Sequence, residues 1–381
     1  MKNSPACTKA GDYFSKEAAD IGTVLFVPCV HSGKEGTMES TQAPIINEEP
    51  NRQPSTHGYK VVCAKLGLSM CVYFICRFLV GAIAALLIRT AGGMNQTLYT
   101  ILSYSIIVLL VYVVPIAFTV IIFKYNVPFK VLYKKPKRLA RALGTFPATF
   151  GFGHGIALLT LLISFLLSKL LGGETLIEQL LRPTTVEEAT SISQVIFMVL
   201  LMVVAAPLFE EYWARGIMFD ALKPYGTGMA IIISSLLFGL SHGSLYMLFY
   251  TTAYGLALGY IRYATGSLFV VTILHAIVNS VGAITLLLLS LSEFTNEENR
   301  YINTVYWIFI IAVFVLIIIS VIVFLTKIPT IRRYKFENSW TQIGGWKKFG
   351  IFLISIPVVI MMILAVNEIT EYRIIKFLFV S

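Results

Sequence analysis

The stretch APLFEEYWARG, from Ala206 to Gly216, places two adjacent glutamates and an arginine at the end of an apolar run. The run is about 15 residues long, which is enough to lie within a membrane. A charged side chain inside hydrocarbon costs about 2.5–3.5 kcal/mol even on the most lenient scale, so such residues are usually functional and partnered. The stretch therefore predicts a membrane helix that carries a functional site.

The composition of the whole chain supports this prediction. The 381 residues are 57% hydrophobic and 13% charged, with a mean hydropathy of +0.78, which excludes a water-soluble domain of this length. We predict an all-α fold, a polytopic transmembrane helix bundle in contact with the lipid bilayer. The formal charge of +10 gathers in two loops beside apolar segments, 124–141 and 327–348, so it indicates membrane topology and no nucleic-acid partner.

The apolar segments predict about eight to nine spans. Residues 1–60 are expected to form a disordered cytoplasmic tail, and 61–381 a multi-span membrane domain with its catalytic core at about 194–290. The predicted spans are 66–88, 98–123, 146–171, 194–222, 228–242, 245–263, 267–290, 305–325 and 349–366. We prefer nine spans, because both basic loops then lie on the side of the amino terminus, which the positive-inside rule assigns to the cytoplasm. The chain is expected in the cell membrane or an endomembrane.

Spacing divides the roles of the charged residues in the central stretch. Adjacent residues on a helix point about 100° apart, so Glu210 and Glu211 cannot face the same cavity. Glu211 and Arg215 are four apart and share a face, which predicts a structural ion pair. Glu210 is then free to face a water-filled pocket as a general base. The alternative is a cluster of interfacial charges at a helix end, without any function.

Two later apolar segments each carry a histidine in a four-residue spacing. Phe238 and His242 lie in FGLSH, and His275 and Asn279 lie in HAIVN. Each pair shares one helix face. The alternatives are a packing histidine and a polar clamp between helices. A carboxylate base, two imidazoles and a carboxamide are the groups that peptide hydrolysis requires.

These three motifs, EExxxR, FxxxH and HxxxN, resemble the CPBP family of intramembrane proteases. This family contains CAAX proteases and bacteriocin-processing enzymes, and is related to the Ras-converting CAAX endopeptidase. The resemblance covers about 194–290. It implies that Glu210 activates water with help from His242, and that His275 and Asn279 bind the oxyanion. Glu211, Arg215 and Phe238 are expected to support them.

The resemblance leaves the metal and the substrate open. Glu210, His242 and His275 can bind Zn²⁺ with water as the fourth ligand, so the cofactor is either none or zinc. We favour glutamate-activated water. The expected substrate is a membrane-anchored peptide or protein. It is either of the CAAX type or one that is cleaved during bacteriocin or membrane-protein processing.

A non-catalytic alternative remains. The protein can be a membrane scaffold or immunity protein, or a proton-coupled transporter that uses its intramembrane acid and histidines. A scaffold has no need of all four cavity residues, and a transporter should show matching halves, which we do not find. Outside the motifs, His154 is expected to be a packing residue, Arg77 must face other helices or snorkel, and the cysteines are expected to be reduced.

Overall fold

The computed structural model describes residues 54–90, 95–136, 139–171, 191–294, 300–333 and 342–370. Within these ranges the regular elements are all helices, which confirms the all-α prediction. The predicted tail lies outside them up to residue 53. The first described helix starts at Thr56, and the Ser55 hydroxyl before it accepts a bond from Gly58 N–H at 3.1 Å.

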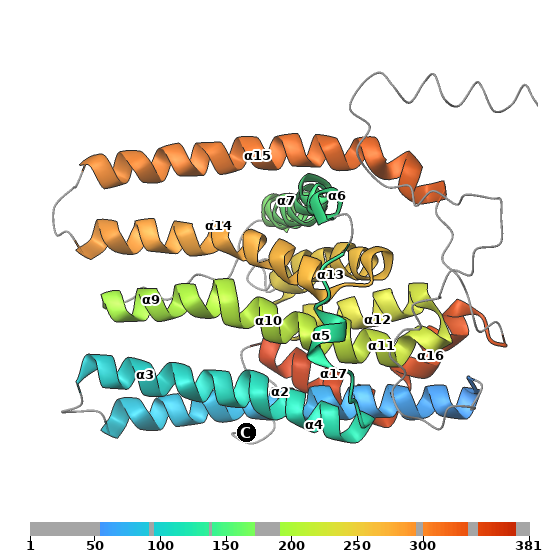
Figure 1. Cartoon of the computed structure of the whole chain (residues 1–381). Coiled ribbons are helices and arrows are strands. Elements are labelled where there is room, and N and C mark those ends of the chain that lie inside the picture. Colours follow the sequence, from blue (N-terminus) through green and yellow to red (C-terminus); the bar gives the residue numbers. More distant parts are fainter. Residues whose placement is uncertain are drawn as a thin grey trace, which may run out of the picture.

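The long helices run along one axis in Figure 1. They are α2 (Thr56–Thr90), α3 (Gln96–Ile107) with η1 (Val108–Val113) and α4 (Val114–Phe123), α14 (Leu268–Phe294) and α15 (Arg300–Arg333). A further long helix is built from α9 (Ile192–Leu200), η2 (Leu201–Ala205), α10 (Ala206–Glu211), η3 (Tyr212–Met218), α11 (Phe219–Leu222) and η4 (Lys223–Tyr225). Short helices α5 (Phe129–Leu132) and α6 (Leu139–Leu143) follow α4.

The number of candidate spans among the described residues is roughly consistent with the eight to nine predicted. By length and composition, six of the described helices can cross a membrane. A seventh span is formed if α16 (Gly345–Leu353) and α17 (Ile356–Ile369), bent by 69°, count as one. The chain is therefore a multi-pass membrane protein, as predicted.

The fifth and sixth predicted spans account for much of the remaining difference. They correspond to α12 (Thr227–Leu240) and α13 (Leu245–Thr265), separated at Gly243 as expected. α12 has 14 residues and is about 21 Å long, which is short of the roughly 30 Å hydrocarbon core. Gly243 adopts a left-handed φ of +67°, and Ser244 caps α13, so the chain turns back at this point.

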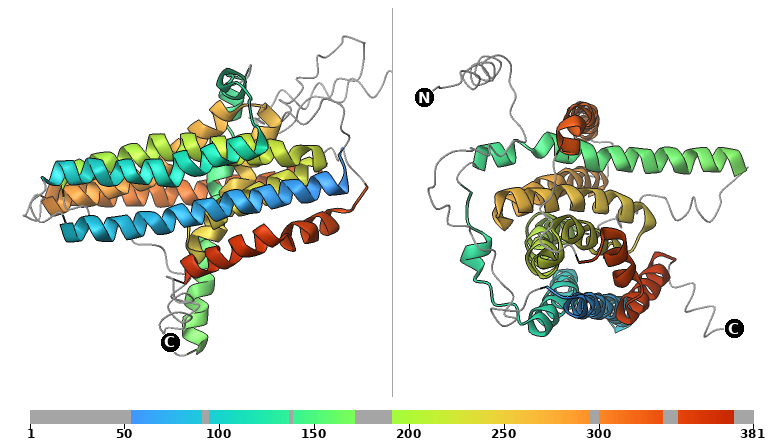
Figure 2. Two further views of the ribbon diagram at one scale, coloured as in Figure 1. Left: turned by 90° about the horizontal axis from the view of Figure 1, so that it is seen from below. Right: turned by 90° about the vertical axis from the view of Figure 1, so that its right-hand side faces the viewer.

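Helix α7 (Phe146–Leu171) has the predicted bounds but a different direction. It is seen end-on in Figure 1 and lies across the long helices in Figure 2. Glycines permit this close crossing: a Cβ at Gly151 would collide with the backbone of Ser320 in α15, and one at Gly153 with the ring of Tyr254 in α13. His154 beside them bonds Tyr254 Oη at 2.7 Å, which agrees with the packing role expected for it.

The described ends of α4 and α15, from which the two basic segments start, lie at the same end of the bundle. In Figure 1, α2 begins, α4 ends and α15 ends at one end, whereas α3, α9 and α15 begin at the other. The segment after α4 carries Lys124, Lys130, Lys134 and Lys135.

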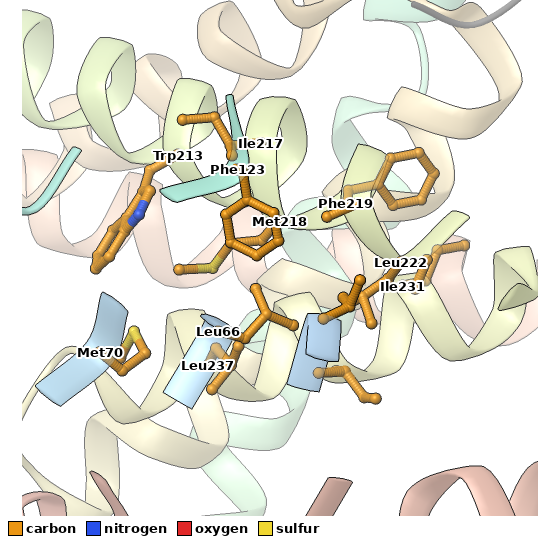
Figure 3. Close-up of a cluster of buried hydrophobic side chains, with 14 of the residues drawn as sticks. Leu66, Met70, Phe123, Trp213, Ile217, Met218, Phe219, Leu222, Ile231 and Leu237 are labelled. Atoms are coloured by element: carbon orange, nitrogen blue, oxygen red, sulfur yellow. The ribbon is translucent and has the colours of Figure 1, made fainter. Parts of the chain in front are cut away.

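A buried apolar core surrounds the helix segment that follows the two glutamates. Figure 3 shows these side chains packed together: Leu66, Met70, Phe123, Trp213, Ile217, Met218, Phe219, Leu222, Ile231 and Leu237. They come from α2, α4, η3, α11 and α12. Trp213 also donates from Nε1 to Thr119 Oγ1 at 2.9 Å. The core therefore fixes the position of η3 and of the glutamates directly before it.

Candidate active site

The glutamates lie on α10, a short α-helical segment between two π-helical ones, η2 and η3. Pro207 explains η2. Ala206 N–H bonds Leu201 O, five residues back, and in that register the next donor is Pro207, which has no N–H. The carbonyl of Met202 therefore needs another donor. In a membrane such a carbonyl is satisfied from a neighbouring helix.

Asn279 supplies that donor. Its Nδ2 bonds Met202 O at 2.9 Å and so ties α14 to η2. The Met202 carbonyl freed by Pro207 thus takes one N–H of the Asn279 amide. A carboxamide has two N–H groups, so one of them remains for another acceptor.

Glu211 and Arg215 form the ion pair that their spacing predicts. Arg215 Nη1 lies 2.9 Å from Glu211 Oε1, and both side chains are fully buried. Gly255 in α13 makes room for the guanidinium, since a Cβ there would lie 3.1 Å from Arg215 Nη2. A contact that the sequence did not predict is made by His275, whose Nδ1–H donates to the same Glu211 oxygen at 2.8 Å. Glu211 therefore orients the imidazole as well as pairing with the arginine.

Glu210 also lies beside His275 and is the more accessible of the two acids. Its side chain is 19% exposed, whereas that of Glu211 is 0% exposed. Its Oε2 lies 3.8 Å from His275 Nε2, and its Oε1 accepts a hydrogen bond from Tyr112 at 3.3 Å. Glu210, Tyr112 and Trp213 help line a small cavity with room for about one water molecule. This geometry suits a carboxylate that activates water.

Phe238 lies between the two histidines. Its ring meets the ring of His242 edge-on at 4.9 Å and that of His275 at 5.7 Å, while the Arg215 guanidinium lies 4.2 Å from the ring centroid. His242 Nδ1 lies 2.8 Å from Phe238 O and must donate to it, because a carbonyl only accepts. This bond fixes the orientation of the His242 ring. The other ring nitrogen, Nε2, takes no part in it.

Glu210, His242 and His275, the possible ligands if zinc is used, do not form a metal site in this arrangement. Over the described ranges no three His, Cys, Asp or Glu side chains group closely enough to hold a metal ion. The reason is visible in the packing, since the Phe238 ring separates the two imidazoles and Glu211 already occupies His275 Nδ1. We derive no step of the chemistry through a metal.

Tyr112 belongs to the site and was not predicted. It lies in η1, where Val114 N–H bonds Leu109 O, five residues back, just before Pro115. Pro115 thus introduces a π segment as Pro207 does. A single tyrosine in an apolar run next to a proline was the only signal in the sequence.

Replacing Tyr112 by phenylalanine tests its contact with Glu210. The variant keeps the stacked contact with Phe209, whose centroid lies 5.4 Å away, and removes only the hydroxyl. Losing one hydrogen bond is worth about 0.5–1.5 kcal/mol, so peptide cleavage should slow by roughly 2- to 12-fold. Tyr104→Phe in the preceding helix, where Tyr104 stacks on Phe197, is the matched control and should cleave at the wild-type rate. Equal rates for the two variants would remove Tyr112 from the site.

Comparison with known proteins places this site in a family. Residues 192–281 match a family model described as Type II CAAX prenyl endopeptidase Rce1-like. No curated protein and no solved structure matches the chain. The matched segment runs from α9 into α14 and contains all seven residues of the three sequence motifs. Over this segment the chain is similar to the Rce1-like CAAX prenyl endopeptidases, which supports the resemblance to the CPBP family of intramembrane proteases.

Proposed function

We propose that the protein is an intramembrane endopeptidase that cleaves a membrane-anchored peptide or protein, with Glu210 as the base that activates water. The observation that carries this proposal is the position of Glu210. Its carboxylate lines a cavity for about one water and lies 3.8 Å from His275 Nε2. Its buried neighbour Glu211 is already engaged by Arg215 and His275.

The reaction follows from these groups. Glu210 takes one proton from water, and the hydroxide oxygen attacks the carbonyl carbon of the scissile peptide bond. The second N–H of Asn279 is a donor that can stabilise the oxyanion. The Nδ1–H groups of His242 and His275 are already engaged by Phe238 O and Glu211, so each imidazole adds a donor at Nε2 only when it is protonated. When the tetrahedral intermediate collapses, the C–N bond breaks and Glu210 returns its proton to the leaving amine. Water is consumed and two peptides are released.

The membrane topology supports a substrate that is itself held in the membrane. The end of the bundle with Lys124, Lys130, Lys134 and Lys135 is the cytoplasmic side by the positive-inside rule, and α2 begins at that end. A prenylated, CAAX-type chain end is the substrate class that the Rce1-like core favours. Processing of other membrane-anchored peptides is the second class.

A panel of peptides tests the proposal. The purified protein in lipid nanodiscs is incubated with prenylated CAAX-type peptides, their unprenylated counterparts and peptides carried by a transmembrane anchor. Mass spectrometry should find two products from at least one membrane-anchored class. Absence of products from the whole panel, with a folded protein, would contradict the proposal and favour a scaffold or a transporter.

Chelators are expected to have no effect on this cleavage. The side chains proposed for the reaction do not group as metal ligands, so removing divalent ions should leave the rate unchanged. The measurement compares rates before and after dialysis against a strong zinc chelator, with and without added Zn²⁺. A rate that falls on chelation and returns with Zn²⁺ would contradict the glutamate mechanism.

A further inference from the structure

The turn that carries His242 is held by helices outside the family match. This turn, 241–244, joins α12 to α13. The carbonyl of Ser241 accepts two hydrogen bonds from α2, one from Tyr73 Oη at 2.7 Å and one from Arg77 Nη1 at 3.0 Å. Both donors lie more than 100 residues before the matched segment, which begins at residue 192.

A second helix completes the contact. Arg77 Nη2 forms an ion pair with Glu368 Oε1 of α17 at 2.6 Å. The side chain of Glu368 is only 9% exposed, and that of Arg77 is 32% exposed. The ion pair thus joins the first and the last described helices, and both of its residues lie beside the turn.

Gly243 shows how tightly the ion pair packs against this turn. A Cβ at Gly243 would collide with the carboxylate of Glu368 and would lie 3.2 Å from Arg77 Nη2. Its φ of +67° also disfavours a side chain. The backbone next to His242 is therefore in direct contact with both charged groups.

From these contacts we infer that Arg77 and Glu368 form a clamp that positions the His242 imidazole. The clamp acts on the backbone at Ser241 and Gly243, on either side of His242, and His242 in turn bonds Phe238 O. Arg77 and Glu368 are positioning residues, because they act through this turn and through Tyr73, whose hydroxyl accepts a bond from Arg77 Nη1 at 3.2 Å. The inference rests on the proposed function, since it concerns the geometry of the same reaction.

This inference explains why an arginine, Arg77, lies in the middle of an apolar span. A charged side chain there is retained when it pairs with another group and serves a function. Arg77 could have satisfied its charge with Glu368 alone, but it also donates to the Ser241 carbonyl. The second bond links the charge pair to the active-site turn.

The test uses the full-length protein in nanodiscs and four variants. Arg77→Met removes the donor, and Glu368→Leu removes the acceptor. Glu368→Gln keeps an oxygen that can accept from Arg77 and serves as the conservative rescue. Lys169→Met, at an exposed position near the end of α7, is the control for losing a cationic side chain. Each protein is measured for kcat, KM, thermal unfolding, and hydrogen exchange of the peptide that covers residues 238–246.

Arg77→Met and Glu368→Leu should each lower kcat by roughly 10- to 100-fold with KM unchanged, because a catalytic group displaced by about 1 Å costs that much. Hydrogen exchange in 238–246 should rise in both. Glu368→Gln and Lys169→Met should match the wild type. A kcat that stays at the wild-type value, or exchange that stays unchanged in 238–246, would overturn the clamp. Because hydrogen exchange needs no substrate, the clamp is testable even if the wild type cleaves nothing, which would refute the proposed function instead.

Discussion

Glu210→Gln is expected to lower kcat by about 10²- to 10⁴-fold, the usual contribution of a general base. Glutamine has nearly the same shape and still accepts the hydrogen bond from Tyr112, but it cannot take a proton from water. The variant should therefore fold, insert and bind peptide as the wild type does. The measurement is single-turnover cleavage, with peptide affinity and thermal unfolding determined on the same samples.

Glu210→Asp is the matched variant for this prediction. It keeps a carboxylate but shortens it by one methylene, so the base moves away from the cavity and from His275 Nε2. An intermediate rate is expected, between those of the wild type and Glu210→Gln. Wild-type turnover by Glu210→Gln would show that another group activates water.

Arg215→Met is expected to have the largest effect on stability. It leaves the carboxylate of Glu211 buried without its arginine, and removing one partner of a buried pair costs about 3–5 kcal/mol. The contact of the guanidinium with the Phe238 ring is lost as well. The measurement is the free energy of unfolding in mild detergent, and the folding yield in the membrane should fall with it. Glu211→Ala should lower the yield in the same way.

The double variant Glu211→Gln, Arg215→Met separates a lost pair from an unpaired charge. Neither charge remains in the double variant. Its loss of unfolding free energy should therefore be smaller than the summed losses of Glu211→Gln and Arg215→Met measured singly. Additive losses would mean that the two side chains do not interact. If Arg215→Met lowers the free energy of unfolding by less than about 1 kcal/mol, the pair contributes no more than an exposed surface ion pair, which would contradict this prediction.

Much of the helix pattern could be predicted from the sequence, because membrane helices are set by long apolar runs. The bounds of α7 were predicted to the residue, and the break at Gly243 was found where glycine follows the histidine. The direction of α7 could not be predicted. It depends on which backbone Gly151 and Gly153 approach, and hydropathy carries no information about that.

For the candidate site, the sequence predicted which residues take part better than it predicted how they contact one another. Helical spacing was enough for the Glu211–Arg215 pair, because both residues lie on one helix four positions apart. The contact of His275 with Glu211 joins α14 to α10, and helical spacing says nothing about contacts between helices. The bond from Asn279 to the Met202 carbonyl could not be predicted, because the sequence does not show that Pro207 frees that carbonyl.

Residues from outside the motifs were harder still to predict. Tyr112 reaches Glu210 from η1, and Arg77 reaches the His242 turn from α2. The sequence marked Arg77 as a charge that needs a partner, but not which of the other helices provides it. The family match, which ends at residue 281, also leaves Glu368 unmarked.

Hydrolysis in H₂¹⁸O tests the central claim most directly. Wild-type protein in nanodiscs and the Glu210→Gln variant are each given one equivalent of a membrane-anchored peptide, and the products are weighed by mass spectrometry. The account predicts two product peptides from the wild type, with one ¹⁸O atom in the new carboxylate, and no product from Glu210→Gln on the same timescale. Equal product from both proteins, or an intact peptide after incubation with folded wild type, would contradict it.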